Sequence, residues 1–206
     1  MTRPYIVALG GTTRIGSSTQ RALALCLREI AALGAETHLV SGPDLDLPPY
    51  TPGARLPIAA RQMVTELRRA DGVILGTPGY HGGISGLVKN ALDYVEELRA
   101  DERPYLEGRA VGCVVTAAGE QGAVTTLLAL RSVVHALRGW PTPLGAAIVT
   151  SSEIFDPTGE CLSKKIDVQL RTLSRQVLAF ATLQKATSSS TSGLAFGPKQ
   201  SCASST

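Results

Sequence analysis

The chain has 206 residues, 44% of them hydrophobic, a length that fits one well-buried domain better than two. The formal net charge of +3 and the pI near 8.8 are only mildly basic, the Lys and Arg residues are scattered, and aromatic residues make up 4% of the chain. Nucleic-acid-binding domains typically concentrate positive charge, so this composition argues against a nucleic-acid partner.

The opening residues MTRPYIVALGG contain a very short apolar run that leads directly into glycines, so they lack the apolar centre of a signal peptide. No apolar stretch approaches the roughly 18 residues that would cross a membrane. The four cysteines are far apart and form no CxxC pair, which favours free thiols in a reducing compartment over disulfides or a zinc site. We therefore expect a cytoplasmic protein without a membrane segment or a bound metal. The cysteines are Cys26, Cys113, Cys161 and Cys202.

Five apolar, often β-branched runs alternate with helical patterns along the chain. The runs are Tyr5 to Leu9, Thr37 to Val40, Val73 to Leu75, Val111 to Val115 and Ala146 to Val149. Such β-α alternation predicts an α/β domain with a parallel sheet, because right-handed crossovers place helices on both faces of the sheet.

The predicted helices lie between these runs. They cover about Ser18 to Leu33, Ile58 to Ala70, Ser85 to Leu98, Gly122 to Leu137 and Ser163 to Leu183. The third has the clearest pattern, with apolar residues from Ile84 to Leu98 at the spacing of a buried stripe, opposite charged residues. This stripe is either part of the core or an interface.

Two segments lack a regular pattern. Pro43 to Pro57 contains five prolines and is predicted to be a long loop. From Thr187 to Thr206 half of the residues are Ser or Thr, which predicts a disordered tail. We therefore expect one domain over residues 1–185 and a Ser/Thr-rich tail over residues 186–206.

Three glycine-containing loops follow the first, third and fourth predicted strands. They read GGTTRIGSST, TPGYHGGIS and TAAGEQGA. Open α/β sheets bind ligands outside the carboxyl ends of their strands, where the strand order reverses. We therefore expect the three loops to be adjacent in space and to form the binding site.

The first loop has the chemistry of a phosphate site. It offers five hydroxyl groups and the Arg14 guanidinium, and the helix predicted to start near Ser18 adds free N–H groups. An ordinary turn with an N-cap residue would account for one or two of the hydroxyls, but not for five and an arginine. This favours anion binding.

Two kinds of phosphate site fit the loop poorly. It has the glycine frame of a P-loop, but Ser17 stands where a nucleoside triphosphatase needs a lysine. A dinucleotide site needs GxGxxG and an acidic residue after the second strand, whereas this chain has GGTTRIG and then Val40, Ser41 and Gly42. A mononucleotide remains.

The other two loops fit the rest of such a ligand. In TPGYHGG, Pro78 and three glycines fix an unusual backbone path, and Tyr80 puts a ring beside it, as a flat heterocycle would require, although Tyr80 could equally be a packed loop aromatic. His81 is a weak candidate for a general acid, and an exposed loop histidine is the commoner interpretation. The N–H groups of TAAGEQGA could face negative charge on the ring, or form a plain strand-to-helix turn.

These segments resemble the NAD(P)H-dependent FMN reductases of the flavodoxin-like superfamily. Gly11 to Arg14, with Ser17 to Thr19, matches their GS-x-R-x-x-S-type loop, and Thr77 to Tyr94, TPGYHGGISGLVKNALDY, matches their TP-x-Y segment and the G-x-L-K-N-A-I/L-D-W/Y that follows it. The resemblance extends over about residues 4 to 183, and the second motif is the more specific. Thr12 replaces a usual serine, and His81 stands where Asn or Lys is common.

The resemblance implies a flavodoxin-like, doubly wound three-layer sandwich with a five-stranded parallel sheet in the order 2-1-3-4-5. It also implies an FMN site made by the three loops. The first loop would hold the phosphate through Thr12, Arg14, Ser17, Ser18 and Thr19. The isoalloxazine would lie against Pro78, Gly79, Tyr80, His81 and Gly82, and the fourth-strand loop would add Thr116, Ala117, Ala118, Gly119 and Gln121.

The implied activity is reduction of FMN by NADH or NADPH, with hydride transfer on the flavin itself and no catalytic side chain required. An FMN-containing quinone, azo, nitro or metal-oxyanion reductase would use the same fold and loops. A flavodoxin-type electron carrier is the alternative of another class, although such carriers tend to be acidic. Arg103 and Arg109 could meet the 2′-phosphate of NADPH, but solvated surface arginines are the commoner case.

The resemblance implies two partners as well. The family commonly forms dimers or tetramers through the helix after the TP-x-Y loop, here Ser85 to Leu98, and a flavin-dependent monooxygenase is a candidate recipient of reduced flavin.

Overall fold

The first apolar run forms strand β1 (Tyr5–Gly10), which lies inside the sheet between β2 (Glu36–Val40) and β3 (Gly72–Tyr80). The computed structural model describes residues 3–150 and 153–190. Both pairings of β1 are parallel, with Leu9 opposite Val40 on one side and opposite Leu75 on the other. The buried apolar runs therefore form the centre of the sheet, as parallel strands covered on both faces require.

The remaining parallel strands continue from β3. Strand β5 (Ala110–Ala117) pairs with β3, and β6 (Trp140–Pro141) and β7 (Ala146–Val149) both pair with β5. The order β2-β1-β3-β5 followed by β6 and β7 confirms the predicted order 2-1-3-4-5. The fifth predicted strand differs in one respect, because it is split into two short pieces that pair with the two ends of β5.

The third strand is longer than predicted. The apolar run ends at Leu75, but β3 continues to Tyr80 and turns back into β4 (Gly83–Ile84), which pairs with it antiparallel. Part of the predicted TPGYHGG loop is thus a short hairpin on the end of the parallel sheet. Thr77 holds the hairpin to the helix that follows, because its Oγ1 accepts the Ser85 N–H at 3.1 Å.

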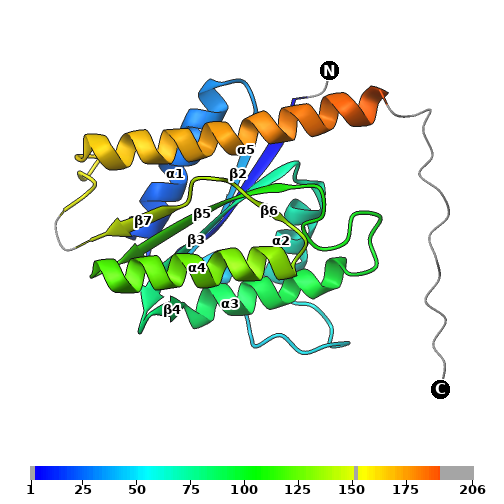
Figure 1. Ribbon diagram of the computed structural model, residues 1–206. Coiled ribbons are helices and arrows are strands. Elements are labelled where there is room, and N and C mark those ends of the chain that lie inside the picture. Colours follow the sequence, from blue (N-terminus) through cyan, green and yellow to red (C-terminus); the bar gives the residue numbers. More distant parts are fainter. Residues whose placement is uncertain (1–2, 151–152, 191–206) are drawn as a thin grey trace.

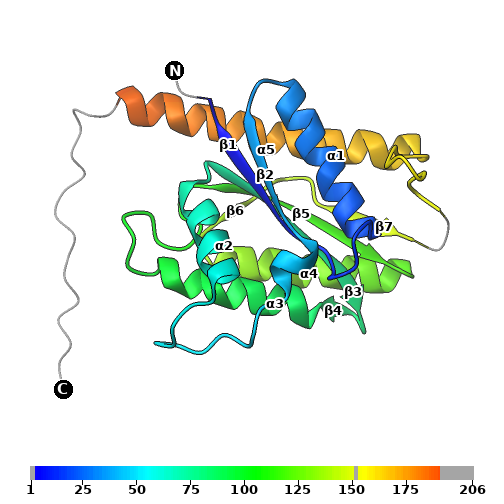
Figure 2. The same cartoon turned by 180° about the vertical axis from the view of Figure 1, so that it is seen from behind.

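Helices cover both faces of the sheet (Figures 1 and 2). Helices α1 (Ser18–Ala32) and α5 (Lys164–Ser190) lie on one face and share a core with Ile6, Ile74 and Val114. The other face carries the second core, with α2 (Ile58–Arg69), α3 (Gly86–Asp93) and α4 (Glu120–Ala136). The three-layer arrangement is the one predicted.

Three helical details differ from the predictions. The third helix is α-helical only to Asp93 and continues as a 3-10 helix over Tyr94–Leu98. The predicted loop from Pro43 to Pro57 begins inside a short 3-10 helix, Gly42–Leu45. The fifth helix continues to Ser190, so residues 186–190 are helical and the expected domain boundary falls inside α5.

Lys185, near the end of α5, anchors this helix to the sheet. The Lys185 ammonium group donates to Asp71 at 2.6 Å and to the Arg3 carbonyl at 3.0 Å, which ties the helix to the amino-terminal ends of the strands. Most of the predicted tail, residues 191–206, lies outside the described residues.

The apolar stripe of α3 belongs to the core. Val88, Ala91 and Leu92 of α3, and Val95 and Leu98 of the 3-10 helix that continues it, are at most 3% exposed and pack under the sheet. An interface formed by this helix would therefore use its charged outer face, where Lys89 and Asp93 form an ion pair. In the described part of the chain, no helix is both long and apolar enough to cross a membrane.

Candidate functional site

A cavity of about 240 Å³ opens where β1, β3, β5 and β7 end. Eleven of its lining residues were predicted from the three loops. They are Thr12, Arg14, Ser17, Ser18, Thr19, Pro78, Gly79, Tyr80, Thr116, Ala117 and Ala118. In Figure 1 this is the left edge of the sheet, toward which the arrowheads of β5 and β7 point. The prediction that the three loops meet is confirmed.

Glycines let the first loop begin close to the sheet. Gly10 has a φ of +143°, and a Cβ at this position would lie 1.8 Å from the Gly76 carbonyl oxygen. The next amide, of Gly11, donates to that same carbonyl at 3.1 Å. Only glycine fits here, so the loop leaves β1 in contact with β3 and then turns toward α1.

The hydroxyl groups of the first loop have different roles. Ser17 is the N-cap of α1, and its Oγ accepts the Gln20 N–H at 3.3 Å. Thr12 closes a local turn, since its Oγ1 accepts the Arg14 N–H at 3.2 Å. The ordinary N-cap interpretation therefore accounts for Ser17. Among the described residues, the Ser18 hydroxyl and the Arg14 guanidinium have no hydrogen-bond partner and remain available to an anion.

Gln20 braces this loop, and sequence reasoning missed it. Its side-chain oxygen accepts the Gly16 N–H at 2.6 Å, and its Nε2 donates to the Ser41 hydroxyl at 2.8 Å. The loop is thus held between α1 and the segment after β2. Only its proximity to the glycine loop in sequence could have indicated this role.

Buried hydroxyls form the floor of the cavity. Thr19, in the first turn of α1, is 1% exposed, and Thr116, near the end of β5, is 5% exposed. Their hydroxyl oxygens lie 2.6 Å apart and form a hydrogen bond. This bond joins the first loop to the fourth-strand loop.

The wall formed by β3 consists of Pro78, Gly79 and Tyr80. A Cβ on Gly79 would lie 2.9 Å from Thr126 Oγ1 and 3.1 Å from Ala117 Cβ, so this position has no room for a side chain on the side facing α4. Tyr80 follows it and is 56% exposed, which contradicts a packed aromatic. A planar ring could approach this wall and remain open to solvent on its other face.

Four predicted residues lie outside the lining of this cavity: His81, Gly82, Gly119 and Gln121. His81 is exposed and has a φ of +52° in the turn between β3 and β4. Gly119 is the N-cap of α4, so the first turn of this helix has no side-chain cap. Its N–H groups therefore stay available to negative charge near Ala118.

Thr150 lines the cavity and was not predicted. It follows β7, and both its N–H and its Oγ1 donate to the Ala117 carbonyl, at 2.8 and 3.2 Å. A single hydroxyl-bearing residue after a four-residue strand does not by itself indicate a binding site in the sequence. The general rule that ligands bind beyond strand ends was the one indication available.

Arg109 is neither a solvated surface residue nor a candidate for nicotinamide binding. Its side chain is buried, and its guanidinium donates to the carbonyls of Ala70, Arg68 and Tyr105 at 2.9 to 3.0 Å. Burial and, secondarily, the Arg103 charge lower the pKa of Arg109 to about 10. Arg103 also donates to the Ala70 carbonyl, at 2.8 Å. The two arginines cap the carboxyl end of α2, far from the cavity (Figure 1).

The cysteines of the described ranges are free thiols. Burial raises the pKa of Cys26 and of Cys113 to about 12, so neither thiol ionises near neutral pH. Cys161 is a free thiol, and Cys202 lies outside the described residues. No group of three or more His, Cys, Asp or Glu side chains that could hold a metal ion occurs within residues 3–150 and 153–190.

The geometry fits a ligand with one phosphate and one flat ring. A helix N-terminus, Arg14 and Ser18 suit the phosphate, and backbone at Gly79 suits the ring. Pockets for whole ligands typically measure about 300–1,000 Å³, so a cavity of about 240 Å³ would hold part of such a molecule and leave part of it exposed.

Comparison with known proteins gives a matching family. A family model described as NADPH-dependent FMN reductase matches residues 4–153. An FMN-dependent NADPH-azoreductase of Staphylococcus aureus (strain USA300) is 33% identical over 105 residues, which are 50% of this chain and 50% of that protein. Azoreductases of the same name from other strains of this species match equally. The chain thus aligns with about half the length of these curated relatives.

Solved structures share the fold. FerB, a flavoenzyme NAD(P)H:(acceptor) oxidoreductase of Paracoccus denitrificans, has a TM-score of 0.72 at 21% identity and covers 88% of this chain and 98% of its own. RosB with a bound flavin-derived intermediate has a TM-score of 0.70 at 14% identity, and the match covers 95% of this chain and 90% of RosB. The apo form of an NADH:FMN oxidoreductase, EMOB, has a TM-score of 0.65 at 20% identity, over 87% and 89%.

Proposed function

Because the chain belongs to the family of NADPH-dependent FMN reductases, we propose that it binds FMN in the 240 Å³ cavity and reduces it with NADPH or NADH. The observation that carries this proposal is the convergence of the loops after β1, β3 and β5 on one cavity. The family model covers all three loops.

The proposed binding roles follow from the contacts. Arg14 and Ser18 bind the phosphate together with the N–H groups at the start of α1. The Thr19–Thr116 pair sets the depth of the cavity. Gly79 lets the isoalloxazine lie against backbone, and the exposed Tyr80 leaves room for the nicotinamide on the outer face.

Bound FMN would supply the hydride chemistry, since the flavin ring accepts a hydride from a nicotinamide stacked on it. The protein's contribution is position and electrostatics. Uncapped N–H groups in the first turn of α4 stabilise negative charge on a ring beside Ala118. No His, Asp, Glu, Lys or Cys is among the described lining residues, so we assign proton transfer to no side chain, His81 included.

The test is a titration and an assay of the purified chain. FMN is titrated while its fluorescence is followed, and NADPH or NADH oxidation is then measured with and without added FMN. Saturable FMN binding and FMN-dependent oxidation support the proposal. A chain that fails to bind FMN contradicts it. A chain that binds FMN but oxidises neither nicotinamide, even when an azo dye or a quinone is added as acceptor, is instead an electron carrier of the flavodoxin type.

A second candidate function is supported by the curated relatives, which are named FMN-dependent NADPH-azoreductases. In this case the chain would keep its FMN and pass electrons to an azo dye, a quinone or a similar acceptor. Purified protein that already contains FMN, and oxidises NADPH only when an acceptor is added, favours this activity. Dependence on added FMN alone favours the flavin reductase.

We further propose a homo-oligomer formed through the outer faces of α3 and α4, which lie side by side in both views (Figures 1 and 2). The exposed face of α4 carries Val124 and Leu128, which are 50% and 63% exposed and one helical turn apart. Size-exclusion chromatography with light scattering tests this, and a monomer at assay concentrations contradicts it.

We also propose that a flavin-dependent monooxygenase receives the reduced flavin. A coupled assay tests this, in which the chain and NADPH are the source of reduced flavin for the monooxygenase.

A further inference from the structure

A second and larger cavity adjoins the proposed FMN site. It measures about 620 Å³ and shares Arg14, Ser18 and Thr150 with the smaller cavity. Its other lining residues come from the end of the first loop, from α1 and from the segment that leads to α5. They are Ile15, Gly16, Arg21, Glu153, Ile154 and Phe155.

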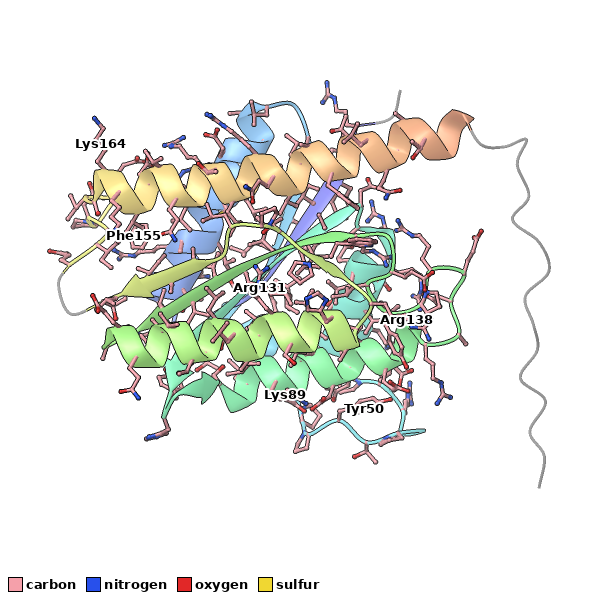
Figure 3. All side chains as sticks on the ribbon, in the orientation of Figure 1. Tyr50, Lys89, Arg131, Arg138, Phe155 and Lys164 are labelled. Atoms are coloured by element: carbon pink, nitrogen blue, oxygen red, sulfur yellow. The ribbon has the colours of Figure 1, made fainter. Side chains whose placement is uncertain are left out.

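The shared residues place this cavity at the phosphate end of the FMN site. It includes neither the β3 wall at Pro78 to Tyr80 nor the β5 residues Thr116 to Ala118, which would face the ring. Figure 3 shows Phe155 between β7 and the start of α5. A group attached to the flavin phosphate would enter this cavity, whereas a nicotinamide must lie over the ring at the other end.

The walls of the larger cavity are held by the protein itself. Arg21 Nη1 donates to the carbonyls of Phe155 and Asp156, at 3.3 and 2.8 Å. The Leu162 N–H donates to the Ile154 carbonyl at 2.7 Å and closes this segment into a loop. Hydrogen bonds within the chain therefore hold the part of this wall that follows Glu153.

Arg21 also faces the phosphate loop. A Cβ on Gly16 would lie 3.7 Å from Arg21 Nη2 and 3.9 Å from its Nε, and neither nitrogen has a hydrogen-bond partner in the described residues. With Arg14, this puts two guanidinium groups against one carboxylate, Glu153, in the lining. The charge balance favours an anionic ligand.

One apolar side chain in the lining is unusually exposed. Ile15 is 75% exposed at the tip of the first loop, although a loop residue without a packing role is commonly polar. Contact with a flat apolar group, such as a purine next to a phosphate, would remove this side chain from water. Among flavin nucleotides, FAD has a second phosphate and a purine attached to the flavin phosphate, as an adenylate group.

We propose that the flavin site extends into the 620 Å³ cavity and accepts FAD, with the second phosphate between Arg14 and Arg21 and the adenosine beside Ile15. This inference rests on the proposed function, because it needs the flavin phosphate at the start of α1. It adds that the phosphate end of the site is open, so that a flavin dinucleotide is a ligand as well as FMN.

The test compares FMN and FAD affinities in matched variants, measured by flavin fluorescence titration. We expect the unaltered protein to bind FAD at least as tightly as FMN. Arg21→Met should weaken FAD about tenfold or more and change FMN by less than about twofold, because the guanidinium faces the second phosphate. The variant also loses the hydrogen bonds to the Phe155 and Asp156 carbonyls, so its thermal unfolding is measured alongside. Arg61→Met, at an exposed position of α2, is the control and should change neither affinity.

Two surface variants distinguish a loss of contacts with FAD from a structural defect in the first loop. Glu153→Gln should tighten FAD about two- to fivefold, since it removes a like charge from an exposed position, and Ile15→Glu should weaken FAD by a similar factor or more. A structural defect would not produce a tightening.

Several results would overturn the inference. If FMN binds but FAD binds more than tenfold more weakly, the phosphate end is closed and the proposed function survives alone. If Arg21→Met raises the KM for NADPH and leaves FAD affinity unchanged, the cavity serves the nicotinamide dinucleotide instead. If neither flavin binds, both the inference and the proposed function fail.

Discussion

The hydroxyl oxygens of Thr19 and Thr116 lie 2.6 Å apart in the floor of the smaller cavity, although 97 residues separate them in the chain. One belongs to the first turn of α1 and the other to the end of β5. Both are nearly inaccessible to water, so each hydroxyl depends on the other for its hydrogen bond. The pair therefore couples the stability of the fold to the shape of the site.

Thr116→Val should lower the free energy of unfolding by about 1–3 kcal/mol, because it leaves the buried Thr19 hydroxyl without a partner. The double variant Thr19→Val with Thr116→Val should recover part of this loss, since two apolar groups of the same shape replace the pair. Urea unfolding measures all three variants. Thr65→Val, on the exposed side of α2, is the control. Additive losses in the double variant would contradict the coupling.

Arg14→Ala should weaken FMN binding by about 1.5–3 kcal/mol, the usual contribution of a hydrogen bond to a charged group. The side chain is exposed and has no partner in the described protein, so its loss should leave the unfolding midpoint unchanged. Fluorescence titration gives the affinity, and Arg61→Ala on α2 serves for comparison. An unchanged FMN affinity would remove Arg14 from the site.

Gly79→Ala should reduce both stability and FMN affinity. The new methyl group would meet Thr126 Oγ1 and Ala117 Cβ, and relief of this contact would push the β3 wall into the cavity, at a cost of about 1–3 kcal/mol. Gly86→Ala is the matched control, because a Cβ there meets nothing within 4 Å and alanine is favourable at this first residue of α3. Thermal unfolding and FMN titration distinguish the two variants. Equal effects would contradict the close contact at Gly79.

The free energy of unfolding should decrease as the pH falls below about 4, and protonation of Glu29 should cause part of this decrease. Burial raises the pKa of this carboxyl, but hydrogen bonds from Arg171 and Arg175, at 2.6 and 2.8 Å, outweigh burial and the pKa lies below its usual value. The folded state thus binds the proton less tightly than the unfolded state, so the stabilisation present above the unfolded pKa is lost as the pH falls through the folded pKa.

Urea unfolding at a series of pH values tests this dependence. Glu29→Gln should flatten the acid limb of the stability curve, whereas Glu36→Gln, at an exposed position of β2, should leave it unchanged. An acid limb that keeps its slope in Glu29→Gln would exclude the ion pairs between α1 and α5 as its cause.

The sequence was sufficient to predict the parallel sheet, because apolar, often β-branched runs alternate regularly with helical patterns. It was insufficient where short or irregular pieces depend on tertiary contacts. Strand β6 has two residues, one of them Pro141, and exists because Val111 is there to pair with it. The extension of β3 passes through a proline and a glycine, which ordinarily indicate a loop.

The candidate site was also predictable only in part from the sequence. Loop positions followed from the rule that parallel strands share one carboxyl edge, and the structure places eleven of the proposed residues around one cavity. Individual hydroxyl roles did not follow, because a Ser such as Ser17 can cap a helix or bind a phosphate with the same atom. Likewise, nothing local distinguishes the buried Arg109 from a surface arginine, since its carbonyl partners at Arg68 and Ala70 come from another element.

The division of the last parallel strand into β6 and β7 also bears on solubility. An uninterrupted outer strand would present a row of unpaired N–H and C=O groups to other molecules and invite edge-to-edge association. Here the edge consists of two pieces of two and four residues, and Pro141 and Pro143 remove N–H donors in and beside the first piece. Filling the gap to make one continuous strand should therefore favour fibrillar aggregates, even if the flavin site is left intact.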